Sequence, residues 1–342
     1  MQKVLNFELN RQDMEIQKLL FNQIKESLPE HLSLVDEISE LLNISYDSAY
    51  RRIRGEKSLS IEELQLLSKR FNLSVDALFN IKSDNIVFKH MPIVPPEVGV
   101  KPWLRRILID MKRIQSANVG EIIYAAKDPP IFHYFQFPEI GAFKMFFWEK
   151  TLFQFPQLAD KKFTLQYLDD EIREVGEQIL VSSLKIPTIE IWNEDTFNIT
   201  FRQIENYWVS GLFEQKEDIH ILCEKLHMWI NHIKKQAELG FKYYYGTEPV
   251  GVEGSYKFYE NEVVLNDNTI FVKTSHFTAT YLTYNVLNLL LTSDPRFCQG
   301  VESYLKGIMR ESVLISSVNA KERNRFFNRL LYKIEQFQEE VH

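Results

Sequence analysis

Cysteine is scarce in this sequence, which has only Cys223 and Cys298 among its 342 residues. Two cysteines cannot form the disulfide framework that holds small secreted domains together. The opening residues, MQKVLNFELNRQDME, contain no apolar stretch of the kind that a secretory signal requires. We therefore expect reduced thiols, no export signal and a cytoplasmic protein.

Long apolar segments are also rare. Residues 274–293 contain no Asp, Glu, Lys or Arg, and a membrane-spanning helix needs about 20 mostly apolar residues. This stretch nevertheless contains His276, Asn285, Asn288 and five threonines, whose polar groups would lack partners in lipid. The pattern favours a buried strand followed by a buried helix, and it predicts no membrane partner.

Motifs for catalysis and cofactor binding are absent too. The sequence contains no GxGxxG, P-loop, GxSxG, HExxH or paired CxxC. His220, Cys223 and His227 share one face of a predicted helix and could supply nitrogen and sulfur ligands to a metal ion. Leu222 and Trp229 form part of an apolar stripe beside them, which favours an ordinary helix flank. We predict no enzyme activity, no cofactor and no metal site.

Proline marks the clearest boundary in the chain. A length of 342 residues exceeds a typical domain of about 100–200 residues, so two domains are expected. Four of the twelve prolines fall within residues 91–102, MPIVPPEVGVKP, and they favour extended backbone. We predict a first domain over residues 1–82, a linker over 83–98 and a second domain over 99–342.

The first domain has the pattern of about five short helices and is predicted to be all α. Ser33 is a plausible N-cap, and Ser60 with Glu63 has the spacing of a capping box. Proline and glycine end two of the helices, at Pro29 and Gly55. The apolar spacing predicts helices over residues 12–28, 33–42, 46–54, 61–71 and 75–79.

The second domain shows both helical and strand patterns, so we predict an α+β fold. Apolar spacing near 3.6 residues predicts helices over 103–115, 165–184, 196–211, 217–239 and 321–341. Residues rich in β-branched and aromatic side chains predict strands over 255–265 and 268–274, joined in a hairpin through the Asn and Asp residues at 266–268. Further strands are expected near 120–126 and 241–246.

Positive charge is concentrated on one short segment of an acidic protein. The net charge of the chain is -7, and residues 1–82 hold eleven basic and thirteen acidic residues, a net charge of -2. Residues 51–57 alone hold four basic residues and one acidic residue, a net charge of +3. A domain that bound DNA through bulk charge would be basic throughout. This one must present a local basic surface.

A helix over residues 46–54 would separate these charges from a small apolar face. At about 100° per residue, Ala49 and Ile53 share one face, with Tyr46 and Tyr50 at its edges. The opposite face then carries Asp47, Ser48, Arg51 and Arg52. Ser and Arg on an outward face can bond base edges or phosphates in the major groove. Alternatively, the arginines simply oppose the dipole at the end of a solvated helix.

Residues 32–78 resemble the phage-repressor (xenobiotic-response-element) type of helix-turn-helix domain. LVDEISELLNIS is similar to the first helix and turn of that family, YDSAYRRIRGEKSLS to its recognition helix, and IEELQLLSKRFNLSVDAL to its closing helices. Ser39 stands where the family usually has Ala, and Asn43 where it usually has Gly. Arg52 occupies a usually apolar position, and Ile53 is expected to pack in its place.

The resemblance implies a bacterial transcriptional regulator that binds double-stranded DNA as a homodimer, with half-sites about one helical turn apart. Ser45, as the N-cap, would place free backbone N–H groups near a phosphate. The residues expected to contact DNA are Ser45, Asp47, Ser48, Tyr50, Arg51, Arg52 and Arg54.

The second domain is too large for a mere appendage of a DNA-binding module, so sensing or oligomerisation is expected. Residues 131–155 contain ten Phe, Tyr and Trp, which could fill a core or line a pocket for a small-molecule effector. A stripe on the last helix could pack in the core or against a second copy; it consists of Phe327, Leu330, Leu331, Ile334 and Phe337. A DNA-tethered enzyme and a protein-interaction platform are the alternative functions.

Overall fold

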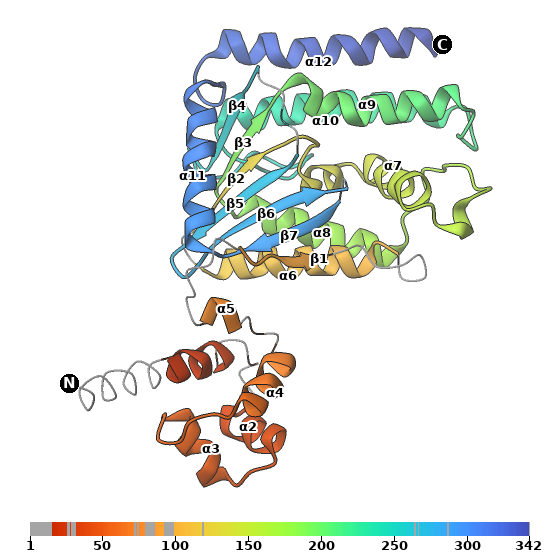
Figure 1. Ribbon diagram of the computed structural model, residues 1–342. Coiled ribbons are helices and arrows are strands. Elements are labelled where there is room, and N and C mark those ends of the chain that lie inside the picture. The colour runs from red at the N-terminus through yellow and green to blue at the C-terminus, as the bar shows by residue number, and fades with distance from the viewer. Residues whose placement is uncertain are drawn as a thin grey trace. The chain divides into compact units, whose positions relative to one another are not determined.

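The computed structural model describes residues 16–25, 28, 32–71, 73, 75–78, 86–91, 99–117, 120–262, 265, 267–285 and 287–341. The chain divides into two compact units, Met1–Val87 and Phe88–His342 (Figure 1). Within the described ranges, no helix is long and apolar enough to cross a membrane.

The described residues of the first unit form an all-helical bundle around a small core. A helix over residues 16–25 is followed by α2 (Leu34–Leu42), α3 (Tyr46–Ile53), α4 (Ile61–Phe71) and α5 (Val75–Leu78). The core side chains are Leu20, Phe21, Ile24, Val35, Ile38, Ala49, Leu67 and Leu78. The helical prediction for this region is confirmed over residues 16–71.

The two capping predictions for this unit differ in outcome. The backbone N–H of Ser60 donates to Glu63 Oε2 at 3.1 Å, and that of Glu63 donates to Ser60 Oγ at 3.2 Å, so the predicted capping box forms. Ser33 precedes α2, but its side chain makes no capping bond.

The second unit is built on one mixed sheet of eight strands. Their order is β1-β7-β6-β5-β2-β3-β4-β8, and only the β2–β3 and β3–β4 pairs are parallel. The strands are β1 (Lys89–Met91), β2 (Gly120–Ala125), β3 (Thr188–Trp192), β4 (Tyr256–Glu260), β5 (Thr269–Thr274), β6 (Thr278–Tyr284), β7 (Asn288–Thr292) and β8 (Val313–Leu314).

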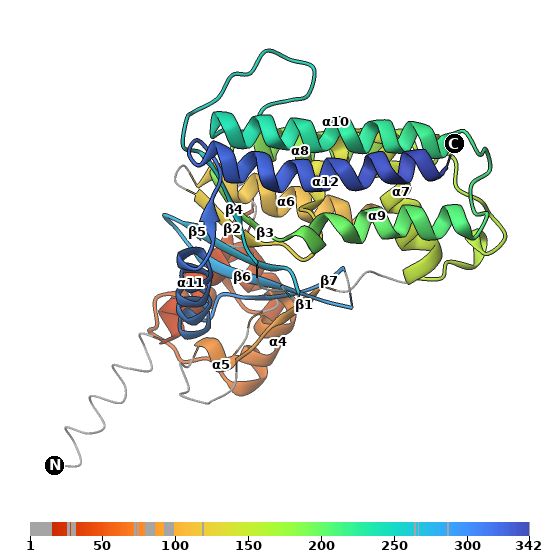
Figure 2. The ribbon, with the colours of Figure 1, turned by 90° about the horizontal axis from the view of Figure 1, so that it is seen from above.

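Helices cover the two faces of this sheet unequally. Helix α11 covers one face, while the other helices pack on the opposite face around the larger core (Figures 1 and 2). Alternation along the strands divides the side chains between these cores; on β2, for example, Ile122 joins the larger one and Ile123 the smaller one. The helices are α6 (Lys101–Ser116), α7 (Pro138–Phe147), α8 (Asp170–Leu184), α9 (Glu194–Val209), α10 (Asp218–Leu239), α11 (Pro295–Arg310) and α12 (Ala320–Glu340), with shorter turns η1 (Ile131–Gln136), η2 (Trp148–Leu152) and η3 (Pro156–Leu158).

The helical predictions for this unit agree with α6, α8, α9, α10 and α12, and the strand near 120–126 is β2. The predicted hairpin between 255–265 and 268–274 is wrong, because β2 and β3 lie between β4 and β5 in the sheet. Asn268 has a different role from a turn residue. Its Oδ1 accepts the backbone N–H groups of Lys127 at 2.8 Å and Asp128 at 3.1 Å.

The strand predicted at 241–246 is also absent from the structure. Side chains, not a neighbouring strand, satisfy the backbone there: the carbonyl oxygen of Tyr243 accepts from Gln136 Nε2 at 3.0 Å and Gln236 Nε2 at 2.9 Å. The strand followed by a helix that was predicted within residues 274–293 is wrong, because this range contains the antiparallel pair β6 and β7. Asn285, at φ 45°, adopts the left-handed conformation that a tight turn between strands requires.

Residues assigned to the linker contribute to the sheet. Lys89–Met91 form β1, which pairs with β7, whereas residues 92–98 lie outside the described part of the chain. Helix α11 was not predicted; Asp294 begins it by accepting the backbone N–H groups of Arg296 and Phe297 at 2.9 and 3.0 Å.

The apolar stripe of the last helix lies within its own unit. On α12, Phe327, Leu330, Ile334 and Phe337 are buried in the larger core, and Leu331 packs against it. Of the two uses considered for this stripe, core packing is the one that the structure shows.

Candidate nucleic-acid interface

The turn between α2 and α3 is set by a residue in the left-handed conformation. Asn43 ends α2 at φ 50° and ψ 52°, and the backbone N–H of Ile44 donates to the carbonyl oxygen of Ser39 at 3.0 Å. Asn is one of the few side-chain-bearing residues that adopt this conformation readily, so it replaces the glycine of similar turns. The chain then enters α3 after only two further residues.

Helix α3 starts with the predicted N-cap and packs on the core through a small apolar face. Ser45 Oγ accepts the backbone N–H of Ser48 at 3.3 Å, which satisfies one of the free N–H groups of the first turn. Ala49 is fully buried in the core of the first unit. Ile53 is only half-buried, so it packs against this core less completely than predicted.

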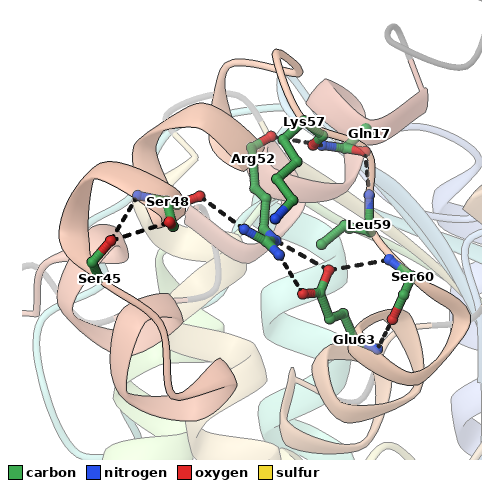
Figure 3. A network of polar contacts seen from close by, with 8 residues as sticks. All are labelled: Gln17, Ser45, Ser48, Arg52, Lys57, Leu59, Ser60 and Glu63. Atoms are coloured by element: carbon green, nitrogen blue, oxygen red, sulfur yellow. Dashed lines mark hydrogen bonds and ion pairs between the residues drawn. The ribbon is translucent and has the colours of Figure 1, made fainter.

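The outward placement predicted for Arg52 is wrong. Its side chain is 5% exposed, and its guanidinium makes two bonds to Glu63, Nε to Oε2 at 3.0 Å and Nη2 to Oε1 at 2.5 Å (Figure 3). Nη1 also donates to the carbonyl oxygen of Ser48 at 3.2 Å. The helix is therefore rotated so that Arg52 occupies the inward position, which a carboxylate on α4 makes possible for a charged side chain.

A glutamine from the helix over residues 16–25 holds the segment that leaves α3. Gln17 Nε2 donates to the carbonyl oxygens of Arg52 at 2.7 Å and Lys57 at 2.8 Å, and Gln17 Oε1 accepts the backbone N–H of Leu59 at 3.1 Å (Figure 3). Sequence periodicity gave no sign of this contact, because Gln17 reads as an ordinary polar position on an amphipathic helix.

The outward face of α3 is polar, aromatic and basic. Tyr46 and Tyr50 are 58% and 49% exposed. The side chains of Arg51 and Arg54 are 52% and 57% exposed and lie 4.0 and 2.9 Å from carboxylate oxygens of Glu56. Exposed ion pairs of this kind contribute little and exchange easily, so both guanidinium groups are available to another partner.

The other predicted contact residues fall around the same face. Ser45 and Asp47 are exposed, and Ser48 is half-buried. Of the seven residues predicted to contact DNA, the structure thus places six on or beside one surface and Arg52 beneath it.

Buried polar groups of the second unit were not found from the sequence. Lys144 Nζ is fully buried and lies 3.0 Å from Asp128 Oδ2, and burial lowers the pKa of this amine. His133 Nε2 lies 2.9 Å from Glu190 Oε1, inside the same core. No motif spacing could indicate these pairs, since their partners lie far apart in the sequence.

Two other candidate sites were a metal site and a ligand pocket in the aromatic run at 131–155. Across the described ranges, no group of three or more His, Cys, Asp or Glu side chains is placed to hold a metal ion. The aromatic run at 131–155 largely fills the core, but Phe132, Tyr134 and Trp148 also line a cavity.

Residues 24–92 match the BetR domain, a helix-turn-helix-like family of DNA-binding domains. The match spans α2 to α5, including the turn and outward face described above, and extends to β1. No curated protein and no solved structure matches the chain. The first unit is thus similar to a helix-turn-helix-like family of DNA-binding domains.

Proposed function

We propose that this protein is a sequence-specific transcriptional regulator that places α3 in the major groove of double-stranded DNA. The observation that carries this proposal is the outward face of α3, where Arg51 and Arg54 flank the exposed rings of Tyr46 and Tyr50 within a domain of a DNA-binding family. An acidic chain gains affinity for DNA only where such cations are gathered.

Arg51 and Arg54 would have different roles in DNA recognition. Arg51 lies in the last turn of α3 and is suited to bidentate contact with a guanine edge, whereas Arg54 at the C-cap is suited to phosphate. Exposed backbone N–H groups beside Ser45 would favour a second phosphate. Arg52 contributes indirectly, because its bonds to Glu63 fix the rotation of α3.

Binding as a homodimer on a two-fold site is part of the proposal, since paired half-sites are the usual arrangement for helix-turn-helix proteins. The stripe on α12 is used within its own core, so it does not supply the contact between copies. The second unit would provide effector sensing, the contact between copies, or both.

Selection of bound sequences from a random DNA pool, with the full chain as bait, tests the proposal directly. Recovery of one preferred motif is expected; recovery of no motif would refute sequence-specific binding. On the selected site, Arg51→Ala should weaken binding by about 1–3 kcal/mol if it reads a base. Arg54→Ala should weaken binding to all sequences alike and lower the salt slope by about one if it contacts phosphate.

The matched control is Arg325→Ala, which removes an equally exposed, carboxylate-paired arginine from the second unit. It makes the same change in net charge and should leave DNA affinity unchanged. Equal losses for all three variants would mean that bulk charge, and not α3, accounts for binding.

A further inference from the structure

Between its helical layer and its sheet, the second unit has a cavity of about 110 Å³ that is partly open to solvent. The walls come from α6, α8, η1 and η2 on one side and from β2, β5, β6 and β7 on the other. Six side chains show its character: Trp103, Ile107, Ile122, Phe132, Trp148 and Tyr281. The lining is therefore mainly aromatic and aliphatic, like the core around it.

The size of the cavity limits what it can hold. An engineered apolar cavity of about 150 Å³ in another protein stays dry and binds benzene. A space of about 110 Å³ is smaller, so it can hold a molecule of about benzene's size only if the walls yield slightly or part of the molecule lies in the open side of the cavity.

Two indole groups of the wall are left with unsatisfied donors. Trp103 and Trp148 are 8% and 1% exposed, and their rings meet edge to face with centroids 5.9 Å apart. Neither Nε1–H has a hydrogen-bond partner among the residues that the structure describes. A buried donor without a partner costs about 1–3 kcal/mol, so an acceptor supplied by a ligand would relieve this cost.

Charged groups at the edge of the cavity are already neutralised. Asp128 lines the cavity, but it accepts from Lys144 Nζ at 3.0 Å and from the Tyr134 hydroxyl at 2.6 Å. Asp110 also lines it, lies 3.7 Å from Arg106 Nε, and has a pKa that burial raises above its usual range. Among the described residues that line the cavity, none is a cation that could bind an anion, and both carboxylates already face a cation, so a neutral ligand fits best.

We propose that this cavity binds a neutral, mostly hydrocarbon molecule with one hydrogen-bond acceptor of the carbonyl type, which contacts the indole N–H of Trp103 or Trp148. The proposal deepens the regulatory role proposed above: it names the chemical class of the effector, and its consequence for DNA binding rests on that role. Binding itself does not depend on DNA.

The test compares two probes of equal size by isothermal titration calorimetry on the full chain without DNA. Cyclohexanone carries the acceptor, and methylenecyclohexane replaces the carbonyl oxygen by a CH₂ group. Wild-type protein should bind cyclohexanone about three- to tenfold more tightly. Cyclohexanecarboxylate, the anionic probe, should not bind. Failure of both neutral probes to bind, or tighter binding of the anion, would overturn the proposal.

Location is tested by filling the cavity. Ile107 lines the cavity and is half-buried, so Ile107→Phe should block it and abolish binding of both neutral probes. The matched control is Ile109→Phe on the same helix, where the side chain is 58% exposed; it should bind like wild type. If Ile107→Phe fails to fold by circular dichroism, Ile270→Phe, at another half-buried lining position, takes its place. A folded filling variant that binds normally would overturn the location.

The role of the indole donors is tested by Trp103→Phe and Trp148→Phe, which keep an aromatic ring but remove the N–H. At least one should bring the ratio between the two neutral probes close to one. Trp229 is the matched control, because its Nε1 is also buried and unpaired but the residue does not line the cavity. Trp229→Phe should keep the wild-type ratio. An unchanged ratio in both cavity variants would refute contact with the acceptor.

The failure of this inference and that of the proposed function can be told apart. Calorimetry without DNA decides whether the cavity binds the probe. Gel-shift titration on the selected operator, with and without saturating cyclohexanone, then decides whether occupancy changes DNA affinity. A protein that binds the probe but no DNA would leave the cavity assignment standing and refute the regulatory role alone.

Discussion

Replacing Arg52 by Ala should destabilise the first unit and not merely weaken DNA binding. The substitution removes two bonds to Glu63 and one to the carbonyl oxygen of Ser48. Breaking a buried ion pair typically costs about 3–5 kcal/mol. Glu63 is about 20% exposed on its side chain and keeps its bond to the Ser60 N–H, so water can partly replace the guanidinium. We therefore expect a loss of about 2–4 kcal/mol.

The tryptophan distribution makes this loss measurable in the full chain. All five tryptophans lie beyond residue 100, so their fluorescence reports on the second unit only. Far-UV circular dichroism reports on both units. In urea titrations, Arg52→Ala should move the dichroism change assigned to the first unit to lower denaturant and leave the fluorescence transition in place.

The same ion pair predicts a dependence on pH. The hydrogen bond from Arg52 is the main cause that lowers the pKa of Glu63 below its usual value. Because the folded-state pKa is the lower one, the added stability is fully present above the unfolded value of about 4.3 and is lost as pH falls through the folded pKa. Arg52→Ala should reduce this loss in acid.

Arg51→Ala is the control, since the Arg51 side chain is 52% exposed and surface substitutions usually change stability by less than about 0.5 kcal/mol. It should weaken DNA binding at unchanged stability, whereas Arg52→Ala should lower the stability of the first unit. If Arg52→Ala unfolds at the same urea concentration as Arg51→Ala, the buried pair and the helix rotation derived from it are wrong.

Substitutions at three further residues test other contacts. Gln17→Ala should cost about 1–3 kcal/mol in the first unit, because it leaves the Leu59 N–H and two carbonyl oxygens without their partner; an unchanged dichroism transition would contradict this. Asn43→Gly should be neutral or slightly stabilising, whereas Asn43→Ala should cost about 1 kcal/mol, as φ is 50°; equal stabilities would exclude strain at the turn. Burial lowers the pKa of His232 to about 4, so the second unit should lose up to about 3 kcal/mol as pH falls from about 6.5 to about 4, by fluorescence-detected unfolding; the same pH slope in His232→Gln would refute that origin.

Much of the local structure follows from the sequence, because helices and caps depend on residues close together in the chain. The apolar spacing of residues 217–239 is satisfied by any single face packed on a core, and it becomes α10. The Ser60 and Glu63 capping box forms as its spacing requires. Asn43 likewise marked the turn, since the left-handed conformation is a property of one residue and its side chain.

The rotation of α3 could not be decided from its own residues. Spacing alone allowed either Arg52 or Ile53 to face inward, and hydrophobicity favoured Ile53. Arg52 can face inward because Glu63, eleven residues later on α4, accepts hydrogen bonds from its guanidinium. Gln17 also holds the backbone at the end of α3 by donating to the carbonyl oxygen of Arg52. Only the tertiary structure brings these groups together, because a charge can be buried only where an opposite charge and hydrogen-bond partners meet it.

The sheet order and the cavity depended even more on contacts between distant segments. Runs rich in β-forming residues near 256 and 270 indicated two strands. Each strand can pair with any other strand of the sheet, however, and β2 and β3 lie between these two. The aromatic run at 131–155 indicated large apolar side chains, but its sequence did not show whether they would pack against one another or line a pocket. The fold packs most of them and leaves Trp148, with Trp103 from α6, facing a space that neither segment could form alone.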